Sequence, residues 1–144
     1  MIKAGIIGAS GYTGRELVKI LIRHPGVSSI NVYGRTYGES LSKDIPEIKG
    51  TYEGLVKPIE PEIILRENDV LFMALPHNVS MDFSPSFQNK IPLIDLSADY
   101  RLTSASSFKT WYGADHKDPS MLSQYTYGLP EINREKIKKS KLIA

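Results

Sequence analysis

The sequence predicts an α/β fold with a doubly wound, mostly parallel sheet that carries helices on both faces. Three observations predict it. A short apolar run at 2–7 leads into a turn with glycines at 8, 11 and 14, and an amphipathic helical pattern comes next. A second strand-like run then follows at 29–33. Strand, tight glycine turn, helix and strand in this order make a βαβ unit, so the expected fold is Rossmann-like.

The first elements follow from hydrophobic patterning. The run Ile-Lys-Ala-Gly-Ile-Ile at 2–7 suits a strand that is buried on both faces. Apolar residues recur with helical spacing over 17–22, and His24-Pro25-Gly26 ends that helix. Residues 29–33 alternate apolar and polar side chains, which is typical of a strand.

The remaining elements are read in the same way, with no internal repeat and no linker between them. We therefore expect a single domain over 1–144. Further strands are expected at 55–59, 69–75, 91–96 and 141–144, and helices from Pro76 to about Gln88, at 104–112 and at 133–139.

Composition excludes several classes of protein. The net charge is only +2, and the basic tail (Lys136, Lys138, Lys139 and Lys141) is expected to be a solvated helix face, so no nucleic-acid partner is predicted. The N-terminus does not resemble a secretory signal, and no run reaches the 18 apolar residues of a membrane span. We expect a cytoplasmic protein without a membrane partner.

The chain has no cysteine, which excludes disulfides, thiolate metal sites and a cysteine nucleophile within these residues. No His, Asp or Glu spacing indicates a metal site. His24 and His116 have no partner pattern and are expected at the surface, whereas Met73 and Met81 are expected in the core.

The turn Gly-Ala-Ser-Gly-Tyr-Thr-Gly at 8–14 is the first candidate site. Gly8 lets the strand turn sharply, Gly11 lets the backbone approach a pyrophosphate, and Gly14 allows close packing of helix and strand. The helix N-terminus offers free N–H groups and partial positive charge to the phosphates. The spacing is G-x-x-G-x-x-G rather than the commoner G-x-G-x-x-G. The cofactor-binding residues expected here are Gly8, Ser10, Gly11, Tyr12, Thr13 and Gly14.

The end of the second strand indicates which dinucleotide binds. Domains specific for NAD usually place a carboxylate there, whereas domains specific for NADP leave the position open and supply an arginine. Here the residues are Gly34-Arg35-Thr36, and the first acid is Glu39. Because arginine can bind a 2′-phosphate through two parallel hydrogen bonds, we expect NADP as the cofactor.

Four segments carry a resemblance to a known family. They are Gly-Ala-Ser-Gly-Tyr-Thr-Gly at 8–14, Phe-Met-Ala-Leu-Pro-His at 72–77, Asp-Leu-Ser-Ala-Asp-Tyr-Arg-Leu at 95–102 and Tyr-Gly-Leu-Pro-Glu at 127–131. In order and approximate spacing they resemble N-acetyl-gamma-glutamyl-phosphate reductases of arginine biosynthesis. One departure is Tyr100, where the family usually has Phe.

The resemblance implies an NADPH-dependent oxidoreductase that reduces a small-molecule acyl phosphate to an aldehyde. In the family, a cysteine thiolate displaces phosphate to give a thioester, hydride from the nicotinamide reduces it, and a histidine serves as acid and base. The family's cysteine lies in an Asn-Pro-Gly-Cys segment just past the equivalent of Ala144. The chain is therefore expected to be the cofactor half of a homo-oligomeric enzyme, and to bind NADP(H) without turnover.

Residues after the two later strands complete the expected site. Arg101 could reach an anionic group of the substrate, although an internal ion pair with Asp99 or Asp95 is an equal alternative. Ligands bind outside the carboxyl ends of strands in open α/β sheets, so further cofactor contacts are expected there. These contacts are assigned to Leu75, Pro76, His77 and Ser97.

Three alternatives remain open. Aspartate-semialdehyde dehydrogenases share the glycine turn but lack the Leu-Pro-His and Ser-Ala-Asp segments. The related aminoadipyl-phosphate reductases cannot be separated on these residues. A stand-alone NADP-binding regulatory module would explain the absence of cysteine, but residues 142–144 resemble a strand cut in mid-element, which favours the enzyme.

Overall fold

The computed structural model describes residues 1–144, which divide into two compact units, Met1–Ala74 and Leu75–Ala144. The two units differ in the elements they contain and in the interactions that stabilise them. Each is therefore described by itself.

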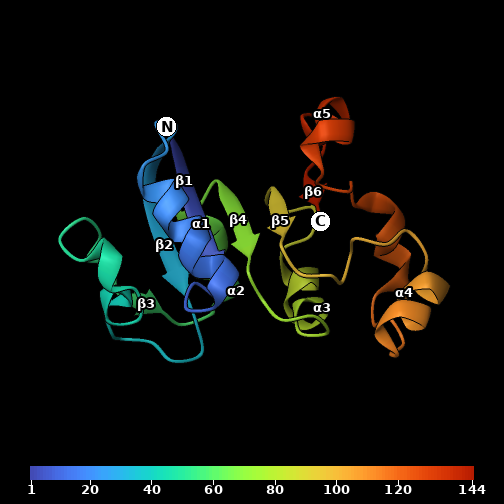
Figure 1. The fold of residues 1–144 in the computed structure, drawn as a ribbon, viewed down its shortest axis with the longest axis horizontal. Coiled ribbons are helices and arrows are strands. Elements are labelled where there is room, and N and C mark those ends of the chain that lie inside the picture. The colour runs from blue at the N-terminus through green and yellow to red at the C-terminus, as the bar shows by residue number, and fades with distance from the viewer. The chain divides into compact units, whose positions relative to one another are not determined.

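The first unit contains a parallel sheet of four strands. These are β1 (Ile2–Ile7), β2 (Val27–Tyr33), β3 (Val56–Lys57) and β4 (Val70–Met73), in the order β3-β2-β1-β4. Each neighbouring pair is parallel. The carboxyl ends of β1, β2 and β4 therefore lie at one edge of this sheet, where α1 begins (Figure 1). The strands predicted in this half are confirmed. Strands β3 and β4 are shorter than the predicted ranges 55–59 and 69–75.

Two helices cover the sheet of the first unit. Helix α1 (Tyr12–Ile22) lies over one face and α2 (Pro61–Glu67) behind the other, as Figure 1 shows. Helix α1 was predicted from its apolar spacing, whereas α2 was not. Two short 3₁₀ turns, η1 (Leu41–Lys43) and η2 (Pro46–Ile48), lie between β2 and β3.

The face under α1 is apolar. Alternate strand residues point to the same side of a sheet, so Ala4 and Ile6 of β1 and Val32 of β2 meet Val18 and Leu21 of α1. All five are buried, and the segment of η1 and η2 adds three further buried side chains, Leu41, Ile45 and Ile48. We call this group the apolar cluster.

The opposite face is partly polar. A Cβ on Gly5 would lie 2.9 Å from Cγ of Asn68, so only glycine leaves room for that side chain. The Asn68 amide donates to the hydroxyl of Tyr33 and to the carbonyl of Ile64, both at 2.8 Å. Buried polar groups are stable when they are paired in this way, and Asn68 is the one buried polar residue of this unit.

The second unit has shorter elements. Its two strands, β5 (Leu93–Asp95) and β6 (Leu142–Ile143), pair in parallel. Its α-helices are α3 (Ser80–Phe83), α4 (Ala105–Tyr112) and α5 (Pro130–Ile137), with 3₁₀ turns η3 (Ser84–Ser86) and η4 (Pro119–Gln124). The predicted helices at 104–112 and 133–139 are confirmed, with Ser104 as the N-cap of α4 and an earlier start for α5.

The prediction of a single helix from Pro76 to about Gln88 is wrong. The segment forms α3 and then η3, and the break falls at Ser84-Pro85. Proline has no N–H and its ring clashes with the preceding turn, so an α-helix does not continue through this position.

The interior of the second unit combines aromatic rings with polar groups. Tyr100 stacks on Tyr125 with ring centroids 4.2 Å apart. His116 packs against Tyr100 and Phe108 in T-shaped arrangements, with ring centroids 5.3 and 4.9 Å apart. His116 is only 8% exposed, so its assignment to the surface is wrong. In the folded chain it packs against two aromatic side chains, and its ring nitrogens hydrogen-bond to the backbone of Asp99 and Asp118.

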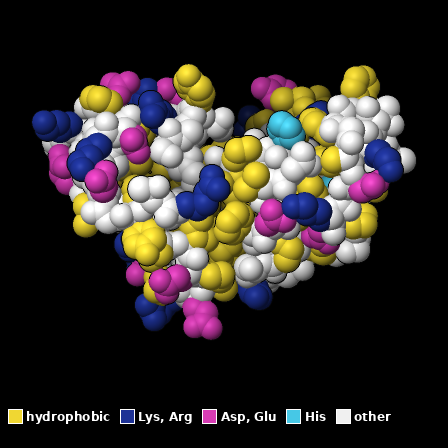
Figure 2. Space-filling model, turned by 90° about the horizontal axis from the view of Figure 1, so that it is seen from below, with side chains coloured by type: hydrophobic (Ala, Val, Ile, Leu, Met, Phe, Trp, Pro, Cys, Tyr) yellow, Lys and Arg dark blue, Asp and Glu magenta, His cyan; other side chains and the backbone are white.

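None of the helices combines the length and apolar character needed to span a bilayer. Acidic and basic side chains are interspersed on the face drawn in Figure 2. The basic tail is exposed as predicted, at Lys136, Lys138, Lys139 and Lys141, and Met73 and Met81 are buried as predicted.

Candidate functional site

The glycine turn follows β1 and is tied to the end of β2. Gly8 has φ of +89°, a conformation that favours glycine. Its N–H donates to the carbonyl of Tyr33 at 3.2 Å, and the N–H of Gly11 donates back to the carbonyl of Gly8 at 3.3 Å. The turn therefore lies beside Gly34, the first residue after β2.

Gly14 is required by the packing of the chain itself, whereas Gly11 is not. A Cβ on Gly14 would lie 2.3 Å from the carbonyl oxygen of Gly8 and 2.7 Å from Cα of Ala9, so the fold itself excludes any other residue. A Cβ on Gly11 would meet only the Gly8 oxygen, at 3.6 Å, which is an ordinary contact. Its φ of −71° is also ordinary. Nothing within the chain requires glycine at position 11, so the open space above it fits the close approach of a ligand.

The N-terminus of α1 is open. Gly11 is its N-cap, no side chain caps it, and its first turn contains no acidic residue. The first N–H groups of a helix have no partner within the helix and carry partial positive charge. Tyr12 is 93% exposed, and Ser10, Gly11 and Thr13 are exposed beside it. This end can accept an anion.

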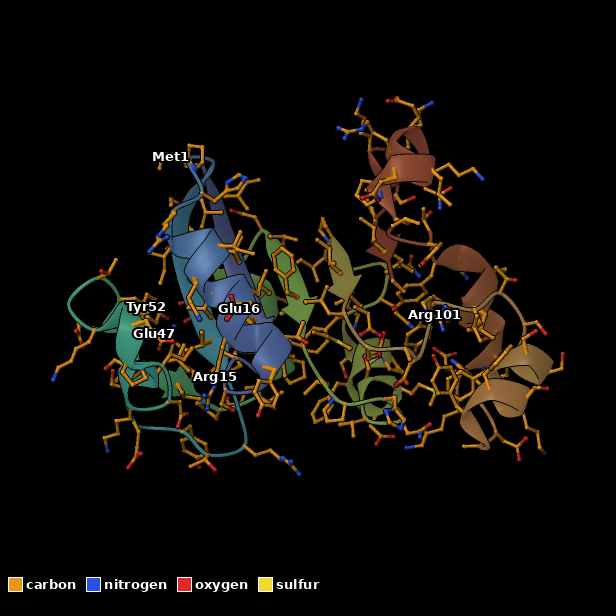
Figure 3. All side chains as sticks on the ribbon, in the orientation of Figure 1. Met1, Arg15, Glu16, Glu47, Tyr52 and Arg101 are labelled. Carbon is orange, nitrogen blue, oxygen red and sulfur yellow. The ribbon has the colours of Figure 1, made fainter.

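Arg15 was not predicted as a site residue from the sequence. Its Nε donates to the carbonyl of Ser10 at 2.7 Å, which fixes the middle of the glycine turn. Figure 3 shows Arg15 at the end of α1 away from Met1. The guanidinium adds positive charge beside the open helix end. A basic residue in the first turn after a glycine motif is the signal that could have indicated it.

The loop after β2 presents Arg35 and Thr36 to solvent. No carboxylate forms an ion pair with Arg35, whereas Glu39 pairs with Lys43 at 3.0 Å. Gly34 is half-buried and donates its N–H to the carbonyl of Lys57 at 3.0 Å. The cation predicted to meet a 2′-phosphate is therefore exposed and free of a competing acid.

In the second unit, Asp99 organises the segment that contains His77. Its carboxylate accepts the N–H of Asn78 at 2.7 Å and the N–H of Met81 at 3.2 Å, and Asp99 is fully buried. Asn78 has φ of +66°, which turns the chain sharply after His77. Leu75 is half-buried, whereas Pro76 and His77 are exposed.

Asp95 and Ser97 form a second arrangement at the end of β5. Asp95 accepts the hydroxyl of Ser80 at 2.7 Å and the N–H of Ser97 at 2.8 Å. The Ser97 hydroxyl accepts the N–H of Asp99 at 3.1 Å, so it is already used within the turn. Burial raises the pKa of the Asp95 carboxyl above its ordinary value, although its two hydrogen bonds oppose the shift.

Arg101 is exposed and bonds to a tyrosine. Its guanidinium donates to the hydroxyl of Tyr112 at 2.8 Å, which raises the pKa of Arg101, and Figure 3 shows where the side chain lies. The ring of His77 lies 6.0 Å from that of Tyr112. No ion pair joins Arg101 to Asp95 or Asp99. Two residues predicted for the site thus share one tyrosine, and the positive charge of Arg101 is not neutralised.

The chain has no group of three or more His, Cys, Asp or Glu side chains that could hold a metal ion. In the first unit the structure brings the glycine turn and the Gly34-Arg35-Thr36 segment together through the bond between Gly8 and Tyr33. In the second unit it brings His77 and Arg101 to Tyr112.

Comparison with known proteins gives consistent matches. The family model described as "Semialdehyde dehydrogenase, NAD binding domain" matches residues 3–140. The chain is 42% identical, over its full length, to an N-acetyl-gamma-glutamyl-phosphate reductase of Nitrosococcus oceani, of which it covers 43%. It is 39% identical to the "[LysW]-L-2-aminoadipate/[LysW]-L-glutamate phosphate reductase" of Sulfurisphaera tokodaii, of which it covers 42%. The chain thus spans less than half the length of these relatives.

Solved structures show the same fold. Aspartate semialdehyde dehydrogenase with NADP from Candida albicans matches with a TM-score of 0.70 and 21% identity, over 96% of this chain and 36% of the other. Aspartate semialdehyde dehydrogenase II from Vibrio cholerae matches with a TM-score of 0.67 and 16% identity, over 100% and 41%. The Rossmann-like fold predicted from the sequence is confirmed.

Proposed function

The chain belongs to the semialdehyde dehydrogenase NAD-binding domain family, and on that basis we propose that it is the NADP-binding part of an N-acetyl-gamma-glutamyl-phosphate reductase. The proposed enzyme reduces an acyl phosphate to a semialdehyde in the cytoplasm and works as a homo-oligomer. Residues 1–144 would act as its single cofactor-binding domain.

The observation that carries the proposal is the open space at Gly11. Gly14 is needed for packing, but the chain leaves room for a Cβ at Gly11. A glycine without an internal reason, at the N-cap of an open helix, fits a pyrophosphate that approaches the backbone. Ser10, Tyr12 and Thr13 would contact the phosphates from the same turn, and Gly8 would set its direction. The cofactor would supply the hydride.

Arg35 supports NADP as the preferred dinucleotide. Its guanidinium is exposed, no acid pairs with it, and Thr36 adds a hydroxyl beside it. A 2′-phosphate would gain charge-assisted hydrogen bonds there, whereas the hydroxyl of NAD would not. Gly34 would let the ribose approach the end of β2.

The second unit supplies the residues proposed for the substrate side. Arg101 carries a charge that no carboxylate neutralises and lies beside Tyr112, so it would bind an anionic group of the acyl phosphate. His77 and the backbone of Leu75 and Pro76 would contact the cofactor, as would Ser97 through its backbone. A cysteine nucleophile would come from outside residues 1–144, because these contain none.

A chimera tests the proposal. Residues 1–144 replace the matching segment of the Nitrosococcus oceani reductase, and NADPH oxidation is followed with N-acetylglutamyl phosphate. We expect turnover with NADPH that releases one phosphate per aldehyde formed, and loss of most of it in Arg35→Ala. A folded chimera that binds NADPH but does not oxidise it with this substrate would contradict the proposal.

A second candidate substrate is an aminoadipyl phosphate. The 39% identity to the Sulfurisphaera tokodaii reductase, close to the 42% for the first relative, favours keeping it. The same chimera assayed with both acyl phosphates discriminates the two. The isolated chain, tested with NADPH and either substrate, is expected to bind the cofactor and to show no turnover.

A further inference from the structure

The loop that carries Arg35 is closed onto a very short edge strand. The N–H of Gly34 donates to the carbonyl of Lys57 at 3.0 Å, and the N–H of Gly38 donates to the carbonyl of Val56 at 2.9 Å. The N–H of Val56 donates in return to the carbonyl of Glu39, also at 2.9 Å. Strand β3 therefore holds both ends of the loop, although it has only two residues. A strand this short depends on its side chains for a fixed position.

The side chain of Lys57 anchors that strand to α2. Its Nζ lies 2.7 Å from Oε2 of Glu67 and donates to Oδ1 of Asn31 at 3.0 Å. The hydroxyl of Tyr33 donates to the same Glu67 oxygen at 3.1 Å. Glu67 thus receives hydrogen bonds from Tyr33, which immediately precedes Gly34, and from Lys57, whose carbonyl accepts the Gly34 N–H.

We infer that Lys57, bridged to Glu67, is a positioning residue for cofactor choice: it fixes the end of β3 and with it the loop that presents Arg35. The inference rests on the proposed function, in which Arg35 meets the 2′-phosphate of NADP. Lys57 does not itself serve as the phosphate-binding cation, because its ammonium group is paired with Glu67. Loss of the bridge does not remove the guanidinium of Arg35, but it lets the loop that positions this guanidinium move.

This role differs from a purely structural one in what it changes. An ion pair that only stabilised the fold would weaken NADPH and NADH binding to the same extent. A pair that positions Arg35 changes the NADPH affinity and leaves the NADH affinity nearly unaltered, since only NADPH carries the phosphate. The ratio of the two dissociation constants is therefore the diagnostic quantity.

The experiment titrates the purified chain with NADPH and with NADH, followed by the fluorescence of the reduced nicotinamide. In Lys57→Met we expect the preference for NADPH to fall about fivefold, within the range of coupling measured inside hydrogen-bond networks. Lys57→Arg retains a donor for Glu67 and is expected to restore most of the preference. Lys138→Met is the matched control, because it removes the same charge from an exposed pair with Glu135 that is not part of the Arg35 loop.

Thermal melts accompany each titration. If Lys57→Met does not fold, Glu67→Gln removes the charge of the bridge while it keeps the shape, and its ratio decides. Wild-type chain without any preference for NADPH would overturn the proposed function. A clear wild-type preference that stays unchanged in Lys57→Met, or in Glu67→Gln where Lys57→Met does not fold, would overturn this inference alone.

Discussion

Residues 1–74 and residues 75–144 bury different kinds of side chain. The first unit places an apolar cluster under α1 and buries a single polar residue, Asn68. The second unit buries two carboxylates, two serines and a histidine: Asp95, Asp99, Ser80, Ser84 and His116. An apolar core tolerates exchanges between hydrophobic side chains of similar volume, whereas a buried polar network is stable only if every member has its partner. The stability of the first unit should therefore be most sensitive to changes in backbone geometry. The stability of the second unit should be most sensitive to the loss of hydrogen bonds.

The largest effect is expected at Gly14 in the first unit. Gly14→Ala places a Cβ 2.3 Å from the carbonyl oxygen of Gly8, where backbone must shift to accept it. We expect a loss of more than about 3 kcal/mol in the free energy of unfolding, among the large values for point mutations. Chemical denaturation measures it. A variant of wild-type stability would show that the turn can relax.

The second effect tests the polar network. Asp99→Ala leaves the N–H groups of Asn78 and Met81 without their acceptor, and we expect a loss of about 2 to 3 kcal/mol. Asp82→Ala is the matched control, because Asp82 forms an exposed pair with Lys117 that is worth less than about 1 kcal/mol. Equal losses in the two variants would show that the burial of Asp99 contributes nothing.

The two units should respond to pH in opposite directions. The hydrogen bond from Lys57 lowers the pKa of Glu67, so its contribution is present above the ordinary pKa of glutamate and is lost as the pH falls through the lowered value. Burial raises the pKa of Asp95, so its contribution is present below the ordinary pKa of aspartate and is lost as the pH rises through the raised value.

Side-chain carboxyl NMR titration of Glu67 and Asp95 checks this contrast. The titration midpoint of Glu67 should lie below the ordinary carboxyl pKa and that of Asp95 above it. Asp95→Asn should remove the transition assigned to Asp95. A midpoint for Asp95 below that of Glu67 would contradict the difference between the units.

The smallest change in stability is expected at Gly11. Gly11→Ala adds a Cβ that meets only the Gly8 oxygen at 3.6 Å. The free energy of unfolding should therefore change by less than about 1 kcal/mol, as for typical replacements at an N-cap. NADPH binding should nevertheless fall by at least about tenfold, since the backbone could no longer approach a pyrophosphate. Calorimetric titration beside a thermal melt separates the two effects. Unaltered NADPH affinity would remove Gly11 from the site.

The same contrast explains how far the sequence could be read. Helix α1 and strand β2 were predictable because their apolar residues repeat with the period of the element, and β1 because its apolar run is short, nearly continuous and followed by glycine. Helix α2 was missed because it has seven residues and only Ile64 fully buried, which leaves little periodicity to detect. The prediction of a helix as far as Gln88 was wrong because Pro85 ends the α-helix. The apolar residues on both sides of Pro85 had suggested that the helix continues.

The candidate site divides in the same manner. The glycine turn and Arg35 follow from local spacing, because their roles depend on backbone conformation and on position after a strand. Arg15 could be indicated only by its place after the glycine motif, whereas its bond to the Ser10 carbonyl is set by the folded chain. Lys57 could not be predicted, because its partner Glu67 is likewise set by the folded chain. His116 becomes buried only when Tyr100 and Phe108 of the folded chain pack against it.

The most direct test of the account is a paired titration of the wild-type chain with NADPH and NADH, repeated with Arg35→Ala. The account predicts that NADPH binds at least about tenfold more tightly than NADH, as expected for an added charge-assisted arginine contact, and that Arg35→Ala removes most of this difference. Equal affinities in the wild-type chain, or no binding of either dinucleotide, would contradict it.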